Sequence, residues 1–355
     1  MHSIFFRSRP ARLSSGLSFI VALGCAGAWS PLWADQADQA DQGERPELTV
    51  YTYESFVAEW GPGPGVEQAF EVRCGCDLRF VALGGGVDIL QRLRLEGAST
   101  EADVVLGLDM NLIHDARELD LLAPHQVDTA ALTLPIDWQD DTFLPYDWGR
   151  FAFVYDRQAL PEPPTSFEEL LDAPEDLKVI ISDPRTSVPG LGLLLWIKHV
   201  YGDRADEAWE RLSPHILTVA SGWSQAYFSL FMNGEAPLVL SYSTSPAYHM
   251  AVENTDRYQA AEFSEGHYLQ VETAAAVAGS DELDLARDFL AFILTPDFQR
   301  HIPLGNVMYP AIDLGDDLPP VFDRLIEPDS FTFTPEEVGE HRRDWIREWL
   351  NASSR

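Results

Sequence analysis

The sequence predicts an α/β fold with two lobes and a ligand cleft between them. Strand and helix patterns alternate along the chain in two series, which is typical of lobes built on largely parallel sheets. The run "ADVVLGLD" at 102–109 is almost continuously apolar, as expected for a strand buried on both faces of such a sheet. Two longer runs, at 143–156 and 266–280, suit strands that pass from one lobe to the other.

The first series begins with strand patterns at 47–53 and 77–83, and the run at 102–109 is its third strand. Helical patterns follow each of them. Between the first two strands lie a loop and a helix within "SFVAEWGPGPGVEQAFEVR", and the later helices are "GVDILQRLRLEG" and "NLIHDARELDLL". The run 143–156, "FLPYDWGRFAFVYD", then leaves this lobe.

The second series continues the alternation of strands and helices. Its expected elements are a helix at 166–173, a strand at 178–184, a helix at 190–202, a strand at 216–220, a helix at 224–236 and a strand at 237–246. After the run 266–280 come one long helix at 282–302 and a final helix at 335–350. The predicted division is 47–150 for the first part of lobe 1, 151–265 for lobe 2, and 266–355 for the return strand, the second part of lobe 1 and the C-terminal helix.

The N-terminus has the pattern of a secretory signal peptide. Three arginines precede the apolar stretch "LSFIVALGCAGAW", which is short for a membrane span, and Ala34 is a suitable cleavage position. We expect residues 1–34 to be removed, residues 35–46 to form a flexible segment, and the remaining chain to be exported and soluble. Lipid attachment at Cys25 is a less favoured alternative, because the usual upstream leucine is an alanine.

The chain is strongly acidic. Its formal net charge is −33, and without the three arginines of the signal segment 21 basic residues stand against 57 acidic ones. Nucleic acid is therefore not expected as a partner, since phosphate contacts need a basic surface. A lysine-poor acidic surface suits a salty medium, in which self-repulsion is screened, so a halophilic or marine protein is expected. The alternative is an ordinary acidic exported protein that also steers cations.

Beyond Cys25 the only cysteines are Cys74 and Cys76, in "RCGCD". In an exported chain two nearby cysteines favour a disulfide, although free thiols stay open as the alternative. No metal site is expected, because the histidines are scattered without ligand spacing.

Ligand-binding positions are expected beyond the carboxyl ends of the strands. This rule selects Tyr53 and Glu54, the glycines 84–86, Asp109, the loop 183–188 and the segment 242–248. Any single one of these aromatic residues is more often part of a core. Their recurrence at several strand ends nevertheless predicts one aromatic cavity suited to a flat organic cation, and it is expected to include Tyr53, Trp223, Tyr242, Tyr248 and Tyr309.

Enzymatic motifs are not found. The glycines 84–86 lack both the lysine of a P-loop and the spacing of a dinucleotide loop, and there is no G-x-S-x-G or H-E-x-x-H motif. We therefore expect a binding protein with no catalytic residue and no cofactor.

A set of motifs running through nearly the whole chain beyond residue 46 resembles the periplasmic thiamine-binding proteins of bacterial ABC-type thiamine transporters. They are "LTVYTYESF", "EWGPGPGVEQAFE", "CGCDL", "ADVVLGLD", "FAFVYD", "DPRTSVPGLGLLLW", "GWSQAY", "LVLSYSTSPAYH", "FSEGHYLQVE" and "GNVMYP". The resemblance implies the two-lobed, type II periplasmic-binding-protein fold with two interlobe strands. It also implies a monomer in the periplasm that binds thiamine and its mono- and diphosphate and delivers them to the permease and ATPase complex of the inner membrane.

Carried over by position, the resemblance implies ligand contacts at Tyr53, Gly85, Gly86, Ser187, Val188, Trp223, Tyr242, Ser243, Thr244, Ser245 and Tyr248, with Asp109 and Tyr309 as additional candidates. Three positions depart from the family pattern. An acid is usual at Gly85, a threonine at Val188 and a tryptophan at Val307, so the preference among thiamine and its esters is left open.

Two other functions stay open at this point. A thiamine-degrading enzyme on the same fold needs a nucleophilic cysteine at the cleft, whereas Cys74 and Cys76 precede a strand whose far end faces the cleft. The other open function is the binding of ferric ion or a polyamine. Ferric sites of this kind use adjacent tyrosines, whereas Tyr242 and Tyr248 are six residues apart.

Overall fold

The computed structural model describes residues 45–354. The predicted signal peptide 1–34, the alternative lipid site at Cys25 and most of the segment 35–46 lie outside the described residues. Among residues 45–354 no helix combines the length and the apolar character that a membrane crossing needs.

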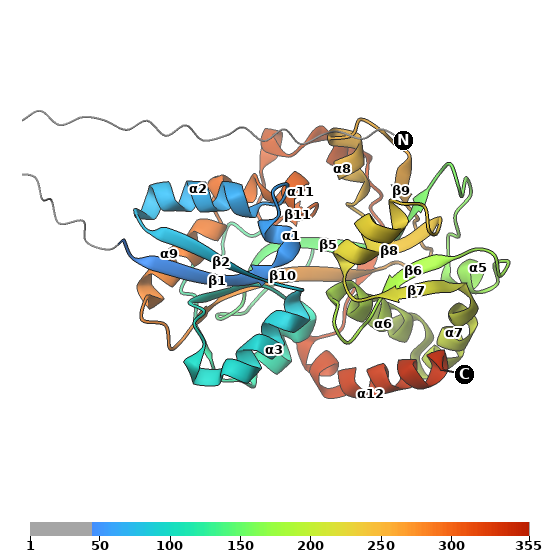
Figure 1. Cartoon of the computed structure of the whole chain (residues 1–355), viewed down its shortest axis with the longest axis horizontal. Helices are drawn as coiled ribbons and strands as arrows, with labels where there is room; N and C mark the ends of the chain where they lie inside the picture. Colours follow the sequence, from blue (N-terminus) through green and yellow to red (C-terminus); the bar gives the residue numbers. More distant parts are fainter. Residues whose placement is uncertain (1–44, 355) are drawn as a thin grey trace, which may run out of the picture. The chain divides into compact units, whose positions relative to one another are not determined.

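The strands form one continuous mixed sheet, in the order β2-β1-β3-β10-β5-β8-β6-β7 (Figure 1). The strands are β1 (Glu47–Tyr53), β2 (Asp77–Leu83), β3 (Val104–Asp109), β4 (Leu122–Ala123), β5 (Leu144–Asp156), β6 (Val179–Ser182), β7 (Ile216–Ala220), β8 (Leu238–Tyr242), β9 (Tyr258–Ala260), β10 (His267–Val277), β11 (Tyr309–Pro310) and β12 (Ser330–Phe331). The predicted fold class is confirmed.

Helices fill the connections between strands. They are α1 (Glu54–Val57), α2 (Gly63–Cys74), α3 (Gly86–Glu96), α4 (Ile113–Arg117), α5 (Phe167–Leu171), α6 (Val188–Tyr201), α7 (Ala205–Leu212), the π-helix η5 (Gln225–Phe231), α8 (Pro246–Ala251), α9 (Leu283–Ile293), α10 (Pro296–Gln299), α11 (Ile302–Gly305) and α12 (Pro335–Ser353). Short 3₁₀ turns are η1 (Gly97–Ser99), η2 (Met110–Leu112), η3 (Gly202–Arg204), η4 (Ser213–His215), η6 (Gly315–Asp317) and η7 (Pro320–Arg324).

The long strands β5 and β10 join the two halves of the molecule, as the sequence predicts. They pair with each other antiparallel through Leu144–Arg150 and Leu269–Ala274. Beyond that pairing, β10 joins β3 while the second half of β5 joins β8 and β9. We call the side of β1, β2 and β3 the first lobe and the side of β6, β7 and β8 the second lobe.

The hydrophobic core is built around these paired strands. Every residue of β3 and of β10 is buried, in line with the apolar runs seen in the sequence. Helices α2 and α3 lie on opposite faces of the first-lobe strands (Figure 1). In the second lobe, β6 and β8 pack against α6, whose residues Val188–Ile197 are all buried.

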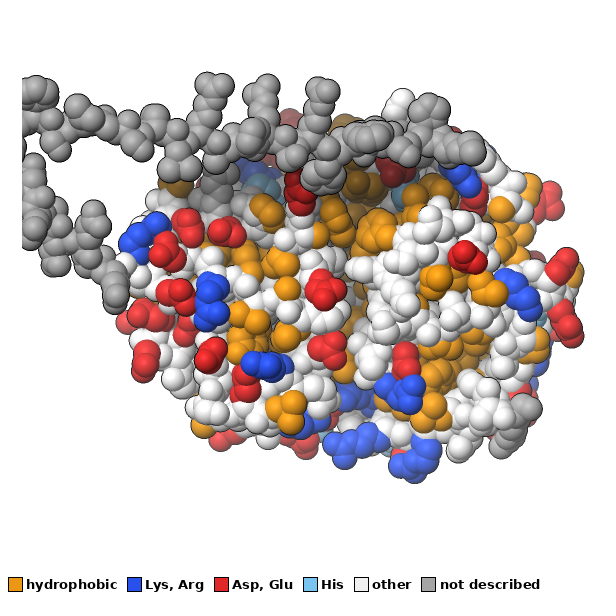
Figure 2. All heavy atoms as spheres, viewed as in Figure 1, with side chains coloured by type: hydrophobic (Ala, Val, Ile, Leu, Met, Phe, Trp, Pro, Cys, Tyr) orange, Lys and Arg blue, Asp and Glu red, His pale blue; other side chains and the backbone are white. Residues whose placement is uncertain are grey.

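Helix α12 packs against elements of both lobes. It starts with a capping box between Thr334 and Glu337, with Pro335 in its first turn. Arg342 forms an ion pair with Asp115 of the first lobe at 2.7 Å, and Glu348 forms one with Lys198 of the second lobe at 3.0 Å. Figure 2 shows arginine and lysine side chains gathered along the edge where α12 runs, whereas acidic side chains cover much of the first-lobe surface.

Two helix predictions are wrong in detail. The single helix expected at 282–302 is divided into α9, α10 and α11, because Pro296 has no N–H to continue α9 and instead starts a new turn. The helix expected at 224–236 forms as the shorter π-helix η5, a geometry that is often found at functional sites.

Candidate functional site

The candidate site is a cavity of about 430 Å³ between the lobes. It lies where strands from both lobes end, as the strand-end rule predicts. The lining residues are Tyr53, Glu54, Ser55, Trp60, Gly84, Gly85, Gly86, Asp88, Thr186, Ser187, Val188, Pro189, Ser221, Gly222, Trp223, Ser224, Gln225, Tyr242, Glu272, Asn306 and Met308.

The two lobes touch at the rim of the cavity. The ring of Trp60, in the first lobe, packs edge-on against Phe228 of η5 with centroids 5.3 Å apart. On another part of the rim, a Cβ added to Gly86 would lie 3.2 Å from Cγ2 of Val188 at the start of α6. Both lobes therefore contribute to the wall of the cavity and contact each other beside it.

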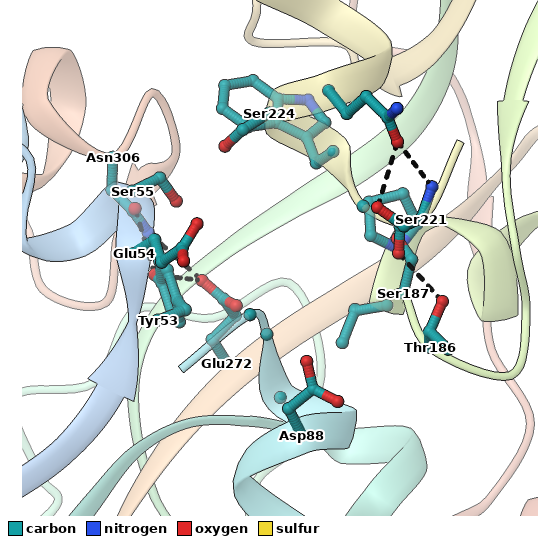
Figure 3. A pocket seen from close by; sticks show the side chains of 18 of the residues that line it. Tyr53, Glu54, Ser55, Asp88, Thr186, Ser187, Ser221, Ser224, Glu272 and Asn306 are labelled. Atoms are coloured by element: carbon teal, nitrogen blue, oxygen red, sulfur yellow. Dashed lines mark hydrogen bonds between the residues drawn. The ribbon is translucent and has the colours of Figure 1, made fainter. Parts of the chain in front are cut away.

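The charged residues that line the cavity are all acidic. They are Glu54, Asp88 and Glu272, and no lysine or arginine is among the lining residues. In Figure 3 their side chains lie on the first-lobe side of the cavity, opposite the hydroxyl groups of Thr186, Ser187 and Ser221. Burial, with the nearby Glu54 as a second cause, raises the pKa of Asp88. This wall favours a positively charged group in the ligand.

The deep end of the cavity is a hydrogen-bonded group centred on Glu272. Its Oε2 accepts from the hydroxyls of Tyr53 and Tyr146 at 3.0 and 3.1 Å, and from Nδ2 of Asn306 at 3.1 Å. The same amide nitrogen donates to Asp147 at 2.5 Å, and the Tyr53 hydroxyl also contacts the Asn306 carbonyl at 3.0 Å. These bonds fix the rings and the carboxylate relative to one another.

The position of Tyr53 depends on Gly107 in the middle of β3. A Cβ on Gly107 would lie 2.5 Å from the Tyr53 ring, and the φ of Gly107 is +113°, which disfavours any other residue. Glycine at this point therefore makes the space that the aromatic wall of the cavity occupies.

The second-lobe wall is polar but uncharged. Ser187 precedes α6, its side chain makes no capping bond, and its Oγ is buried without a hydrogen-bond partner among the described residues. The Trp223 indole donates to Oγ of Ser241 at 2.7 Å, and Ser241 in turn contacts Oγ of Ser245 at 2.8 Å. The two serines therefore orient the indole, while Ser187 has hydrogen-bonding capacity left for a ligand.

Seven of the eleven carried-over positions line the cavity: Tyr53, Gly85, Gly86, Ser187, Val188, Trp223 and Tyr242. The other four, Ser243, Thr244, Ser245 and Tyr248, do not. The first three are buried, and Ser245 acts through Ser241 and through its bond from the Tyr242 amide at 3.3 Å. The ring of Tyr248 lies against His249 in α8.

The two additional candidates also lie outside the lining. Asp109 is fully buried and accepts a hydrogen bond from Asn111 at 2.8 Å. Tyr309 stacks on Trp148, with ring centroids 4.4 Å apart, on strand β11. The expectation that five aromatic residues share the cavity is thus wrong for Tyr248 and Tyr309, because α8 and β11 present these rings to other parts of the protein.

Sequence reasoning missed several lining residues, among them Trp60, Asp88, Glu272, Asn306 and Met308. A signal did exist for Glu272, because it is the single charged residue in the buried strand "HYLQVETAAAV". Asn306 and Met308 flank Val307, a buried residue with φ of +56°, which is rare for a β-branched side chain. Such strained positions are concentrated at ligand sites.

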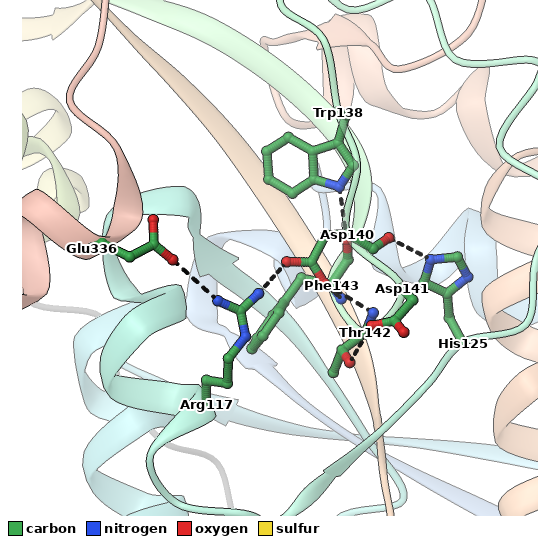
Figure 4. A network of polar contacts seen from close by, with 8 residues as sticks. All are labelled: Arg117, His125, Trp138, Asp140, Asp141, Thr142, Phe143 and Glu336. Atoms are coloured by element: carbon green, nitrogen blue, oxygen red, sulfur yellow. Dashed lines mark hydrogen bonds and ion pairs between the residues drawn. The ribbon is translucent and has the colours of Figure 1, made fainter.

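A second hollow, of about 620 Å³, lies on the first lobe beside Arg117, His125 and Asp140. Figure 4 shows the polar contacts that these three side chains make. Arg117 forms ion pairs with Asp140 and with Glu336 of α12. His125 accepts a hydrogen bond from the Val127 amide at Nδ1, which leaves Nε2 to donate to the Asp140 carbonyl at 3.1 Å. These contacts hold the loop before β5 against α4 and α12, so the polar groups here serve the fold.

Cys74 and Cys76 form a disulfide at the end of α2. They immediately precede β2, whose other end leads to the glycines of the cavity. Within residues 45–354 no group of three or more His, Cys, Asp or Glu side chains is arranged to hold a metal ion.

A cavity enclosed by two α/β lobes that are joined by crossing strands defines a solute-binding protein. Residues 99–338 match the family described as bacterial extracellular solute-binding protein, which is more than half of the chain. The chain belongs to this family.

Two curated relatives and one solved structure make the comparison more specific. The thiamine-binding periplasmic proteins of Salmonella typhimurium and Escherichia coli are each 53% identical over 312 residues, covering 88% of this chain and 94% of theirs. A solved periplasmic thiamin binding protein superposes with a TM-score of 0.85 at 52% identity, covering 88% of this chain and 97% of that one.

Proposed function

We propose that this chain binds thiamine between its lobes in the periplasm and delivers it to an ABC-type transporter. The observation that carries the proposal is the composition of the cavity wall. Aromatic rings and three carboxylates line the cavity with no lysine or arginine, in a chain 53% identical to thiamine-binding periplasmic proteins over 88% of its length.

The chemistry of thiamine suits this wall. Its thiazolium ring carries a permanent positive charge, which carboxylates and aromatic faces attract. Glu54, Asp88 and Glu272 supply the negative charge, while Tyr53, Trp223 and Tyr242 supply the rings. The cavity volume of about 430 Å³ falls in the range of small-molecule sites.

The polar end of the ligand is proposed to face the second lobe. Ser187 Oγ is buried, without a partner in the described part of the chain, at the N-terminus of α6, where backbone N–H groups favour an oxygen or an anion. The hydroxyethyl group of thiamine, or the phosphate of its mono- or diphosphate, would lie there. Because no basic side chain lines the cavity, phosphate recognition would depend on backbone and hydroxyl groups.

Delivery is proposed to follow from lobe closure. Contacts between the lobes, such as Trp60 with Phe228, bring the two lobe surfaces into one arrangement that a permease can recognise. The partner would be the permease and ATPase complex of the inner membrane, and the protein would act as a monomer after removal of residues 1–34. A cross-linking assay with the reconstituted transporter, with and without thiamine, tests this step.

A thermal-shift panel tests the ligand. The purified protein is heated with thiamine, its monophosphate, its diphosphate, spermidine or ferric citrate, all at one concentration, because a ligand that binds more tightly then stabilises the folded state more. We expect the largest rise in melting temperature with thiamine or its esters. A larger rise with ferric citrate or spermidine would reject the proposal.

We propose no catalytic role. A thiamine-degrading enzyme would need a thiol at the ligand, but Cys74 and Cys76 are joined to each other, and β2, of seven residues at about 3.3 Å each, separates them from the cavity. Incubation with thiamine and aniline should leave thiamine intact. Thiamine turnover that is lost in Cys76→Ser would show an enzyme instead.

A further inference from the structure

Three carboxylates stand side by side at the crossing of the lobes. Glu272 of β10 pairs directly with Asp109 of β3 on one side and with Asp147 of β5 on the other. We call these three residues the carboxylate row. Like charges placed directly opposite each other on neighbouring strands are destabilising, so the arrangement calls for a compensating group or a bound proton.

The fold provides donors to the row but no ion pair. Asp109 and Asp147 are fully buried, Glu272 is 8% exposed and lines the cavity, and no ion pair between described residues includes any of the three. Oδ1 of Asp109 and Oδ1 of Asp147 have no hydrogen-bond partner among the described residues. The row therefore has unused acceptor capacity directly behind the cavity wall.

The groups that face the row come from every neighbouring element. Tyrosine hydroxyls approach from β1, β5 and β8 (Tyr53, Tyr146 and Tyr242), and the Asn306 amide approaches from the turn after α11. Among residues 45–354, the cation that acts on the row is Arg342 of α12, which lowers the proton affinity of Asp109 and forms its own ion pair with Asp115. None of these groups neutralises Glu272.

Proton affinity is correspondingly high in the row. Burial, followed by the charge of Glu272, raises the pKa of Asp147 well above its usual range. Burial also raises the pKa of Glu272, and it raises that of Asp109 to about 7. In the ligand-free protein near neutral pH, the row therefore retains at least one proton.

We propose that the carboxylate row is the counter-charge for the cationic ring of the ligand, and that binding of the cation beside Glu272 expels a proton from the row to solvent. This inference rests on the proposed function and adds its coupling to pH. The balance is simple: the protonated protein and the thiamine cation give the complex and one released proton, and no other bond changes. Affinity for the cation then rises with pH until the row is already deprotonated.

Titration calorimetry of the purified protein with thiamine tests the coupling. The titration is done at pH 7 in phosphate and in Tris, two buffers with different heats of ionisation, so that the slope of the observed heat gives the protons released. Unesterified thiamine is used because the second ionisation of a phosphate, near pH 6, would add its own protons. We expect release of between about one half and one proton per thiamine bound.

Variants locate the source of the proton. Glu272→Gln keeps the shape and the acceptor oxygen for Tyr53 and Tyr146, and it should bind thiamine at least tenfold more weakly with the proton release abolished. Glu59→Gln, an exposed carboxylate outside the cavity lining, is the matched control and should keep both values. A neutral isostere, in which a thiophene replaces the thiazolium ring, should release no proton from the unaltered protein.

The outcomes separate the two claims. Tight binding of thiamine with the same heat in both buffers overturns the coupling and leaves the proposed function standing. No binding of thiamine overturns both. The measurement on the unaltered protein decides the question even if Glu272→Gln does not fold.

Discussion

Glu272 of β10 and Asp147 of β5 occupy directly opposed positions on the two strands that join the lobes, and the Asn306 amide donates to both carboxylates. The relationship places a pair of buried acids at the point about which two lobes can close on a ligand. It connects the packing of the central strands with the charge of the cavity.

The buried carboxyl group of Asp109 should make the free energy of unfolding depend on pH. Its pKa is raised to about 7 by burial, so the folded state holds this proton more tightly than the unfolded chain, and stability falls as pH rises from about 4 to about 7. Asp109→Asn should reduce this fall, with Asp147 and Glu272 left to contribute their own, and it should raise the free energy of unfolding at pH 8 by on the order of a few kcal/mol. Urea unfolding at pH 5 and pH 8 measures it. An equal pH dependence in the variant would contradict the assignment.

Gly107→Ala should displace Tyr53. The new methyl group would lie 2.5 Å from the ring at a φ of +113°, so the ring or the strand must move. We expect thiamine affinity to fall at least tenfold and stability to fall by about 1–3 kcal/mol. Gly279→Ala, where no atom lies within 4 Å of the added carbon, is the control and should change neither. Unchanged affinity in Gly107→Ala would remove Tyr53 from the binding wall.

Ser241→Ala should weaken binding through Trp223. The substitution removes the acceptor of the indole N–H, a contact of 2.7 Å that holds the ring on the second-lobe wall. A lost hydrogen bond of this kind costs about 1 kcal/mol, or about fivefold in the dissociation constant. Ser229→Ala changes an exposed serine on the π-helix η5 and should bind normally. Fluorescence titration compares the two variants, and equal affinities would show that the indole needs no such support.

Gly85→Asp should separate thiamine from its monophosphate. The backbone of Gly85 is extended, with φ of 173°, and the nearest atom to an added Cβ is the Thr186 carbonyl oxygen at 4.0 Å, so the fold accepts the side chain. A fourth carboxylate at the cavity should tighten binding of the cation and weaken binding of the phosphate ester. Equal changes in both dissociation constants would exclude a role for this loop in ligand preference.

Salt should stabilise the protein. With a formal net charge of −33, self-repulsion destabilises the compact state, and added salt screens it. We expect the melting temperature to rise by several degrees between about 0.05 M and about 2 M sodium chloride. Equal melting temperatures would refute adaptation to a saline medium, and the acidic surface would then need another explanation.

The strands could be predicted closely, because their signals are local. The strands 47–53, 77–83 and 216–220 have the predicted bounds, and β5 and β10 differ from the predicted runs by a few residues. The boundaries of the helices could be predicted less well. The breaks around Pro296 and the π geometry of η5 depend on how these segments pack against the rest of the chain.

Site residues could be predicted only where their place at the carboxyl end of a strand puts them at the cleft. Tyr53, Ser187 and Trp223 follow strands of the sheet, so the strand-end rule places them at the cleft. Glu272 and Asn306 reach the cavity through the crossing of β10 and the turn after α11. The lone acid in the buried strand marks Glu272 as unusual, but no local pattern shows that either residue faces the cavity. Tyr248 and Tyr309 are tyrosines like Tyr53, but they lie on α8 and β11 and do not line the cavity.

The central claim is that thiamine binds between the lobes, and calorimetric titration of the purified protein with thiamine tests it most directly. We expect one site per chain with a dissociation constant below about 1 µM, or about −8 kcal/mol. A dissociation constant no tighter than about 1 mM, roughly −4 kcal/mol, would contradict it.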